Sequence, residues 1–220
     1  MALLKIDNIC YSYDKRRNVL NNISYDFESG AIYAIVGKSG AGKTTMLSLL
    51  SGLAEPTAGK IYYKDQDIAK MNKYDFRSKC VGVIFQNFNL LSKLTAVENV
   101  VLSMEISGKK DKDKKKQAYE LLEKVGLDRD EADRRILKLS GGQQQRVAIA
   151  RALSYDPDII LADEPTGNLD GETQNEIMGI FKNLADAGKC VIIVTHSPEV
   201  AEMADFVYEI KREPKKLKSR

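Results

Sequence analysis

Two glycine-rich segments of the chain offer backbone amides and side chains that suit phosphate oxygens. The first is Gly37-Lys38-Ser39-Gly40-Ala41-Gly42-Lys43-Thr44, and the second, much later in the chain, is Leu139-Ser140-Gly141-Gly142-Gln143. Glycines let backbone N–H groups turn inward around a phosphate, and a helix that begins at the loop adds positive potential. The first segment has the spacing of a phosphate-binding loop. We therefore expect Lys43 to meet the β and γ phosphates of a nucleotide and Thr44 to offer its hydroxyl to Mg²⁺.

Four short apolar segments are expected to be buried parallel strands of one sheet. They cover residues 32–36, 81–85, 159–162 and 191–194, and they are followed in turn by the glycine loop, Gln86, Asp163-Glu164 and Thr195-His196. In an open α/β sheet, ligands bind beyond the carboxyl ends of the strands. The sequence therefore predicts that these polar groups converge on one crevice.

The polar residues after these strands have the types that phosphoryl transfer needs. We expect Asp163 to anchor Mg²⁺ and Glu164 to orient or deprotonate the attacking water. The Gln86 amide can bind both metal ion and water, and His196, the only histidine of the chain, is placed to donate a hydrogen bond to the γ-phosphate. Taken singly, Gln86 could equally lie on the surface and His196 would more often be structural. Together with the phosphate loop they indicate nucleotide hydrolysis, because this chemistry depends mainly on positioning and charge stabilisation.

Composition and charge indicate an ordinary cytoplasmic globular protein. The chain has 220 residues, which suits one compact domain, and its 34 basic and 31 acidic residues give no overall reason to expect nucleic acid as a partner. We see no apolar run of the roughly 18 to 20 residues that span a bilayer, and no secretory signal. Cys10, Cys80 and Cys190 are far apart, odd in number and without metal-ligand spacing, so we expect reduced structural thiols.

The remaining pattern predicts an α/β fold with an antiparallel β layer over residues 1–30 and 60–68. Residues 95–125 are helical in pattern, and Ser140 is placed to cap a helix that carries Val147, Ile149, Ala150 and Leu153. We expect a nucleotide-binding core of residues 1–86 and 158–210, an inserted helical subdomain of residues 87–157 and a basic tail of residues 211–220. The charged run 109–116 is interpreted as a solvated turn or helix start, with a partner-contacting patch as the alternative.

In order and spacing, these residues resemble the ATPase of ABC transporters over nearly the whole chain, from about residue 9 to 210. The set comprises the phosphate loop at 37–45, the Q-loop at Gln86, the signature at 139–143, the acidic strand ending at Glu164, the D-loop at Asn168-Leu169-Asp170 and the switch His196. The resemblance implies an ABC-type P-loop NTPase cassette with a mixed or parallel core sheet, and it implies ATP and Mg²⁺ as ligands. The nucleotide contacts that it implies in the phosphate loop are Gly37, Ser39, Gly40, Ala41, Gly42, Lys43, Thr44 and Thr45.

In that family two cassettes pack head to tail, so a second copy of this chain is an implied partner. The Ser140 hydroxyl and the Gly141 and Gly142 amides of one copy would complete the γ-phosphate site of the other. Gln143 belongs to the same signature, and Asp170 would lie across the same interface. The resemblance also implies an adenine-stacking aromatic upstream of the phosphate loop. Tyr13 suits it best and Tyr11 second, with packing of the tyrosine inside the β layer as the alternative.

Residues 165–170 and 85–91 resemble cassettes of macrolide-export, lipoprotein-release and antimicrobial-peptide-resistance systems. This implies a transmembrane permease subunit as partner, a peripheral location on the inner face of the cell membrane, and an exporter or mechanotransmitting system for peptides, lipids or antibiotics. Two departures stand out. Ser92-Lys93 replaces a common proline where the coupling helix of the membrane partner docks, and the C-terminal end lacks the usual Asp-Gly turn and closing strand. The tail is expected to be disordered, or alternatively to touch anionic lipid or an acidic face of the membrane subunit.

A different function class stays open at this point. The same ATP cycle could drive a regulatory or mechanical module that signals through a membrane partner to cell-wall machinery without transporting a substrate. ATPases of DNA repair and translation are disfavoured, because the chain has neither a long coiled-coil insertion nor a second cassette. A cassette does not contact the cargo, so the sequence does not name it.

Overall fold

A four-stranded antiparallel sheet forms the outer layer of the protein, as the sequence predicts. The computed structural model describes residues 2–14, 18–167 and 169–211. The strands of this β layer are β1 (Leu4–Tyr11), β2 (Leu20–Phe27), β4 (Ala58–Tyr63) and β5 (Gln66–Asp67), in the order β2-β1-β4-β5. Gly59 allows β4 to pass close to a bulge in β1, since a Cβ at this position would lie only 2.3 Å from the carbonyl oxygen of Asn8.

The core sheet is parallel, with the strand order β6-β7-β8-β3-β9. It consists of β3 (Ile32–Val36), β6 (Val81–Ile84), β7 (Ile159–Asp163), β8 (Cys190–Thr195) and β9 (Phe206–Glu209). The four central strands were predicted from continuous apolar runs, and β8 is buried along its whole length. The edge strand β9 was not predicted, because Phe206 and Val207 are half exposed and its pattern lacks the continuous burial of the other strands. The rest of the basic tail, residues 212–220, lies outside the described residues.

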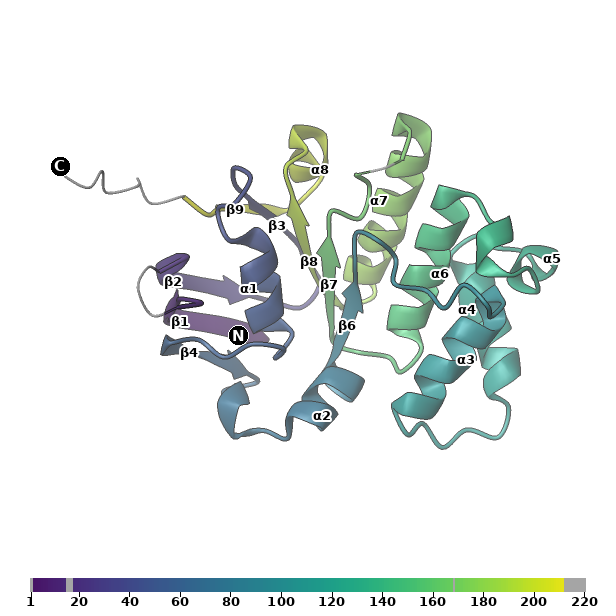
Figure 1. The fold of residues 1–220 in the computed structure, drawn as a ribbon, viewed down its shortest axis with the longest axis horizontal. Helices are drawn as coiled ribbons and strands as arrows, with labels where there is room; N and C mark the ends of the chain where they lie inside the picture. The colour runs from purple at the N-terminus through teal and green to yellow at the C-terminus, as the bar shows by residue number, and fades with distance from the viewer. Residues whose placement is uncertain (1, 15–17, 168, 212–220) are drawn as a thin grey trace.

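The core sheet lies between two apolar cores. On one side it packs with the β layer and α1 (Lys43–Leu50), through Phe27, Met46 and Ile192. On the other side it packs against helices that include α7 (Gly171–Asp186), through Phe181 and Ile193. α8 (Pro198–Glu202) follows β8 near the carboxyl ends of the strands (Figure 1). Packing on both faces of the core sheet keeps the carboxyl ends of the central strands side by side.

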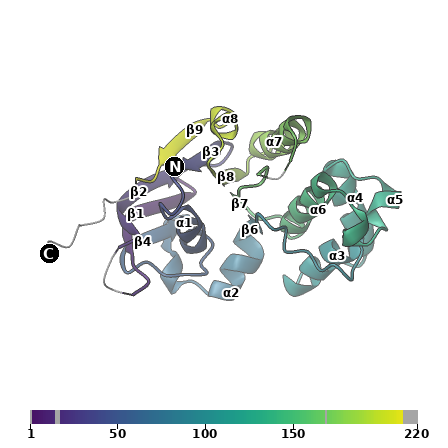
Figure 2. The same ribbon diagram turned by 45° about the horizontal axis from the view of Figure 1, so that its top comes forward.

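Four helices gather at one end of the molecule, beyond β6 and β7, as two views show (Figures 1 and 2). They are α3 (Ala96–Ile106), α4 (Lys114–Lys124), α5 (Arg129–Ala132) and α6 (Gly141–Leu153). The helical pattern predicted over residues 95–125 is interrupted, since Gly108 has a φ of 73° after α3 and Asp113 caps α4. The charged run 109–116 therefore forms a turn and the start of a helix. Short helical turns occupy Ile68–Lys70, α2 (Lys73–Asp75), Phe76–Cys80 and Ile136–Lys138.

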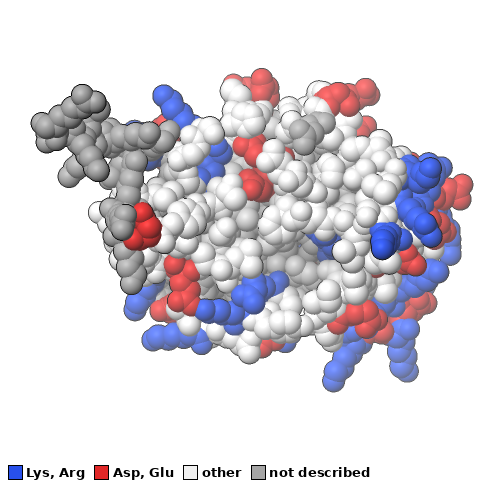
Figure 3. All heavy atoms as spheres, viewed as in Figure 1, with Lys and Arg blue, Asp and Glu red and all other residues white. Residues whose placement is uncertain are grey.

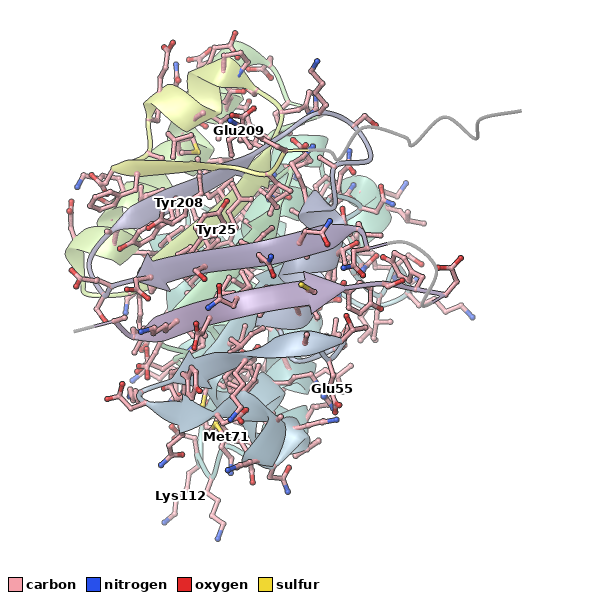
Figure 4. The ribbon with its side chains drawn as sticks, turned by 90° about the vertical axis from the view of Figure 1, so that its left-hand side faces the viewer. Tyr25, Glu55, Met71, Lys112, Tyr208 and Glu209 are labelled. Atoms are coloured by element: carbon pink, nitrogen blue, oxygen red, sulfur yellow. The ribbon has the colours of Figure 1, made fainter. Side chains whose placement is uncertain are left out.

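Aromatic side chains connect the edge strand β9 to the β layer. The rings of Tyr25 and Tyr208 stack with centroids 4.1 Å apart (Figure 4). The Tyr25 hydroxyl donates to the carbonyl oxygen of Glu209 at 3.2 Å, and the Tyr208 hydroxyl donates to that of Asp26 at 2.9 Å. These contacts fix the end of β9 beside the strand ends of the core sheet.

The three cysteines are unpaired, as expected, and burial raises the pKa of the Cys190 thiol to about 12. Within the described ranges, none of the helices has the length and apolar character needed to cross a bilayer.

Candidate active site

A cleft of about 940 Å³ opens at the carboxyl ends of the central strands. Its lining contains the polar groups that the sequence places after β3, β6, β7 and β8, so the predicted convergence is confirmed. The described residues that line it are Tyr13, Val19, Val36, Gly37, Lys38, Ser39, Gly40, Gly42, Lys43, Thr44, Thr45, Gln86, Asp163, Glu164, His196 and Glu209. Ala41 belongs to the same loop but is 1% exposed.

The glycine loop connects β3 to α1 and wraps one end of the cleft. Gly42 caps α1 with a φ of 105°, a conformation that favours glycine, and a Cβ there would lie 2.8 Å from Leu20 Cδ2. Lys43 is the first residue of α1, and its Nζ donates to the carbonyl oxygen of Gly37 at 2.8 Å. The loop is therefore compact, with the lysine ammonium folded back over it.

Asp163 ends β7 and faces the start of α1. The Thr44 hydroxyl donates to its Oδ2 at 3.3 Å. Burial raises the pKa of Asp163, the neighbouring Glu164 charge adds to this, and the Thr44 hydrogen bond opposes it. A half-buried carboxylate with a raised pKa is a group that a cation would stabilise.

Glu164 is held by the end of β8. Its backbone has a left-handed φ of 46°, and its N–H donates to the carbonyl oxygen of Val194 at 2.8 Å. Its carboxylate accepts from the Thr195 hydroxyl at 3.2 Å and from the His196 N–H at 3.3 Å, and Oε1 lies 2.7 Å from His196 Nδ1. The Glu164 side chain is 11% exposed and the His196 side chain 70%. The carboxylate is thus fixed in direction, while the imidazole reaches into the open cleft.

Gln86 lies after β6 and lines the cleft. The loop that follows it is held in place by hydrogen bonds from side chains of other segments. The guanidinium of Arg151, near the end of α6, donates to the carbonyl oxygens of Phe88 and Asn89, two residues with left-handed backbone. The Asn99 side chain bonds to both the N–H and the carbonyl oxygen of Leu91, at 2.8 and 3.2 Å. Burial lowers the pKa of Arg151, whose acceptors here are neutral carbonyls.

Of the two candidate stacking tyrosines, Tyr13 lies at the cleft. Tyr13 is 72% exposed, and its hydroxyl lies 2.8 Å from Thr45 Oγ1. Tyr11 is absent from the described lining and packs edge-on against the Tyr13 ring, with centroids 5.0 Å apart.

The signature lies at the start of α6 and Asp170 at the start of α7. The described residues that line the cleft include neither the signature residues nor Asp170. Ser140 caps α6 in a capping box, with the Gln143 N–H donating to Ser140 Oγ at 3.3 Å. Gly141 and Gly142 form the first residues of α6. Asp170 caps α7 and accepts from the Thr173 N–H and hydroxyl, both at 2.9 Å, which lowers the pKa of Asp170. Asn168 of the predicted D-loop lies outside the described residues.

Sequence reasoning missed several residues at this site. Val19 and Glu209 line the cleft, and the bond of the buried Thr195 hydroxyl to Glu164 was not predicted, although Thr195 itself was expected at the crevice. The position of Thr195 beside His196 was the available signal for its role. Val19 and Glu209 reach the cleft only through tertiary packing.

Comparison with known proteins gives consistent results. Residues 20–167 match the family described as ABC transporter. YclH, an uncharacterized ABC transporter ATP-binding protein of Bacillus subtilis (strain 168), is 44% identical over 214 residues, which are 96% of this chain and 95% of that protein. MacB, a macrolide export ATP-binding/permease protein of Escherichia coli (strain K12), is 43% identical over 215 residues, covering 95% of this chain and 33% of MacB. The dimeric post-hydrolysis structure of the ATP-binding cassette MJ0796, bound to ADP and Pi, is 35% identical with a TM-score of 0.85, covering 96% of this chain and 97% of that chain.

Proposed function

This chain belongs to the ABC transporter family, and we propose that it is the subunit that binds and hydrolyses ATP to energise a membrane transporter. The observation that carries the proposal is the shared cleft, because the glycine loop, Asp163 and the Glu164–His196 pair all line it. The ADP and Pi bound to MJ0796 support hydrolysis in a relative of the same fold.

The glycine loop is proposed to hold the phosphates. Lys43 exchanges its bond to the Gly37 carbonyl for the β and γ phosphates, and the loop amides surround the β-phosphate. Tyr13 stacks on the adenine, since its exposed ring stands at the rim of the same cleft. Such stacking adds on the order of 1 kcal/mol to binding.

The residues where the start of α1 faces the end of β7 fit Mg²⁺, which prefers oxygen ligands. Asp163 Oδ2 and Thr44 Oγ1 lie 3.3 Å apart, the Gln86 amide lines the same cleft, and burial raises the pKa of Asp163, so a bound cation would stabilise its charged form. We assign Asp163 as the anchor, with Thr44 and Gln86 as further ligands. When bound, the ion neutralises charge that develops on the phosphate oxygens.

Glu164 is proposed as the base that orients or deprotonates the attacking water. Two donors, the Thr195 hydroxyl and the His196 N–H, hold its carboxylate in one direction beside His196 Nδ1, which is the positioning that phosphoryl transfer requires. The exposed His196 ring then donates a hydrogen bond to the γ-phosphate.

The signature is proposed to act on the nucleotide of a second copy. Ser140, Gly141, Gly142, Gln143 and Asp170 stand at the starts of α6 and α7, away from the described lining of this chain's own cleft. The dimeric assembly of MJ0796 supports a head-to-tail pair. In that pair, residues 87–157 would move the signature as one helical subdomain relative to the core of residues 1–86 and 158–210.

A transmembrane permease is the proposed second partner. MacB joins an ATP-binding part to a permease in one protein, and its similarity to this chain supports an exporter or mechanotransmitting system for peptides, lipids or antibiotics. Two adjoining depressions share Arg77 and Tyr155, and they are lined by the exposed apolar side chains Leu53, Tyr74 and Ile106. The middle of the face that α2 and α3 flank is largely uncharged (Figure 3), which suits an apolar contact. The cassette would then lie peripherally on the inner face of the membrane.

Separate measurements of ATP binding and turnover test this assignment. Lys43→Ala should lose nucleotide affinity because the ammonium group that meets the phosphates is gone. Glu164→Gln should retain affinity within a few-fold and lose turnover by about 10²–10⁴-fold, as expected for removal of a general base. The assays are titration with a fluorescent ATP analogue and phosphate release with Mg²⁺. Normal turnover by Glu164→Gln would remove Glu164 from the role of base.

A further inference from the structure

One buried amide on α6, the helix that begins with the signature, has no hydrogen bond to any described residue. Gln145 lies on α6 and is 1% exposed, and neither its Nε2 nor its Oε1 has a hydrogen-bond partner among the described residues. Buried polar groups in folded proteins are nearly always paired, and a partnerless amide is destabilising. Such a group needs an explanation from the rest of the molecule.

Helix geometry shows which neighbour this side chain faces. At about 100° per residue, Gln145 points between the directions of Gly141 and Gly142, one turn earlier on α6. A Cβ on Gly141 would lie 3.8 Å from Leu169 Cδ2, and a Cβ on Gly142 would lie 2.7 Å from Thr173 Cγ2. The Gln145 amide is therefore directed toward the segment that begins α7.

α6 and α7 are connected at this point, but not through the Gln145 amide. Arg146, the next residue on α6, pairs with Glu176 of α7 at 2.6 Å. Ser140 caps α6 and Asp170 caps α7, so both helix starts belong to the surface proposed to meet a second copy. Closure of two copies would press these starts against the partner's nucleotide and against each other.

We propose that Gln145 is a positioning residue that stabilises the closed dimer. Its amide has no partner among the described residues of the single chain, and it gains hydrogen bonds to the backbone between Leu169 and Thr173 when the dimer closes. The open state carries the destabilising amide and the closed state relieves it, so the residue shifts the equilibrium toward closure. This inference rests on the proposed ATP-dependent dimer.

The test uses the Glu164→Gln chain as parent, with Gln145→Met added. Methionine has similar length and volume but cannot form the amide hydrogen bonds. The matched control is Ser154→Ala, because Ser154 is fully buried at the end of the same helix and its Oγ also has no partner among the described residues. Thermal unfolding without nucleotide and dimer formation during ATP titration are measured for each variant.

Gln145→Met is expected to raise Tm by about 2–6 °C and to weaken ATP-driven dimerisation about tenfold. Ser154→Ala should also raise Tm, with dimerisation unchanged. With Glu164 restored, Gln145→Met should lower kcat about tenfold and leave KM for ATP within about twofold, because the chain's own phosphate loop is untouched.

The inference is overturned if the Gln145→Met chain dimerises like its parent, if Ser154→Ala weakens dimerisation equally, or if Gln145→Met lowers Tm, which would assign a purely structural role. A rise in KM with unchanged kcat would also overturn it. A parent chain that stays monomeric in ATP would instead refute the proposed dimer itself.

Discussion

Two adjacent carboxylates at the end of β7 have opposite surroundings. Asp163 is half-buried beside Glu164, with the Thr44 hydroxyl as its hydrogen-bond donor, and its pKa is raised. Glu164 accepts hydrogen bonds from the end of β8 and is fixed in orientation. The first environment favours a bound cation and the second favours a positioned base. The two roles proposed for this strand end therefore rest on the different contacts of two neighbouring side chains.

The raised pKa of Asp163 predicts a pH-dependent effect of Asp163→Asn on the nucleotide-free chain. A carboxyl with a raised folded-state pKa contributes stability below its ordinary pKa, and this contribution is lost as pH rises through the raised value. Asp163→Asn should therefore have a higher Tm than the parent chain at pH 7.5, and the difference should narrow as pH falls toward the ordinary carboxyl pKa of about 4. Thermal unfolding at a series of pH values measures this. A lower Tm at pH 7.5, or a gap that widens in acid, would contradict the assigned environment.

Residues that follow a strand were predictable from sequence, and residues joined across the fold were not. Gln86 and Asp163 come directly after an apolar run and His196 comes one residue later, and all three line the cleft. Arg151 holds the loop after Gln86 through a hydrogen bond from its guanidinium to the carbonyl oxygen of Phe88, 63 residues earlier in the sequence. Periodicity within one segment carries no information on such a contact.

The helices and strands were predicted well where burial is continuous. β3, β6, β7 and β8 match their apolar runs, whereas β9 escaped because an edge strand with exposed Phe206 and Val207 lacks that pattern. The break between α3 and α4 was hidden in the helical pattern of residues 95–125, which keeps its spacing on both sides of Gly108, but the interpretation of the charged run 109–116 as a turn or helix start placed it correctly. The position of a strand at the edge of the sheet depends on the assembled fold, so the local apolar pattern does not predict it.

The two depressions that share Arg77 and Tyr155 are the proposed docking surface of the permease, so a charge introduced there should weaken permease association. Leu53, which is 57% exposed, lines one of the depressions there. Leu53→Glu should reduce co-purification with a permease captured by this chain from membrane extracts by at least about tenfold, because a carboxylate would be desolvated in an apolar contact. Met203→Glu, at an exposed apolar position after α8, should leave co-purification unchanged. Equal loss in both variants, or no loss in Leu53→Glu at unchanged Tm, would contradict docking at this surface.

At the scale of the whole molecule, the chain carries all the groups proposed for catalysis, but not in one place. The phosphate loop, Asp163, Glu164 and His196 share a cleft, and the signature stands at the start of α6 outside its described lining. The sequence order already contained both halves, and the resemblance to ABC ATPases supplied the idea of a second copy. Only the fold separates the two halves in space, which makes a symmetric pair with two composite sites the simplest complete arrangement.

The mass of the Glu164→Gln chain in saturating ATP and Mg²⁺ tests this central claim most directly. Blocked hydrolysis should trap the closed pair, so light scattering after size exclusion should give twice the 24.6 kDa of one chain. Adding Ser140→Arg, which places a bulky cation where the partner's γ-phosphate would bind, should return the mass to 24.6 kDa while ATP still binds. A Glu164→Gln chain that stays monomeric in ATP, or a Ser140→Arg double variant that pairs as well as its parent, would contradict a site completed by the signature of a second copy.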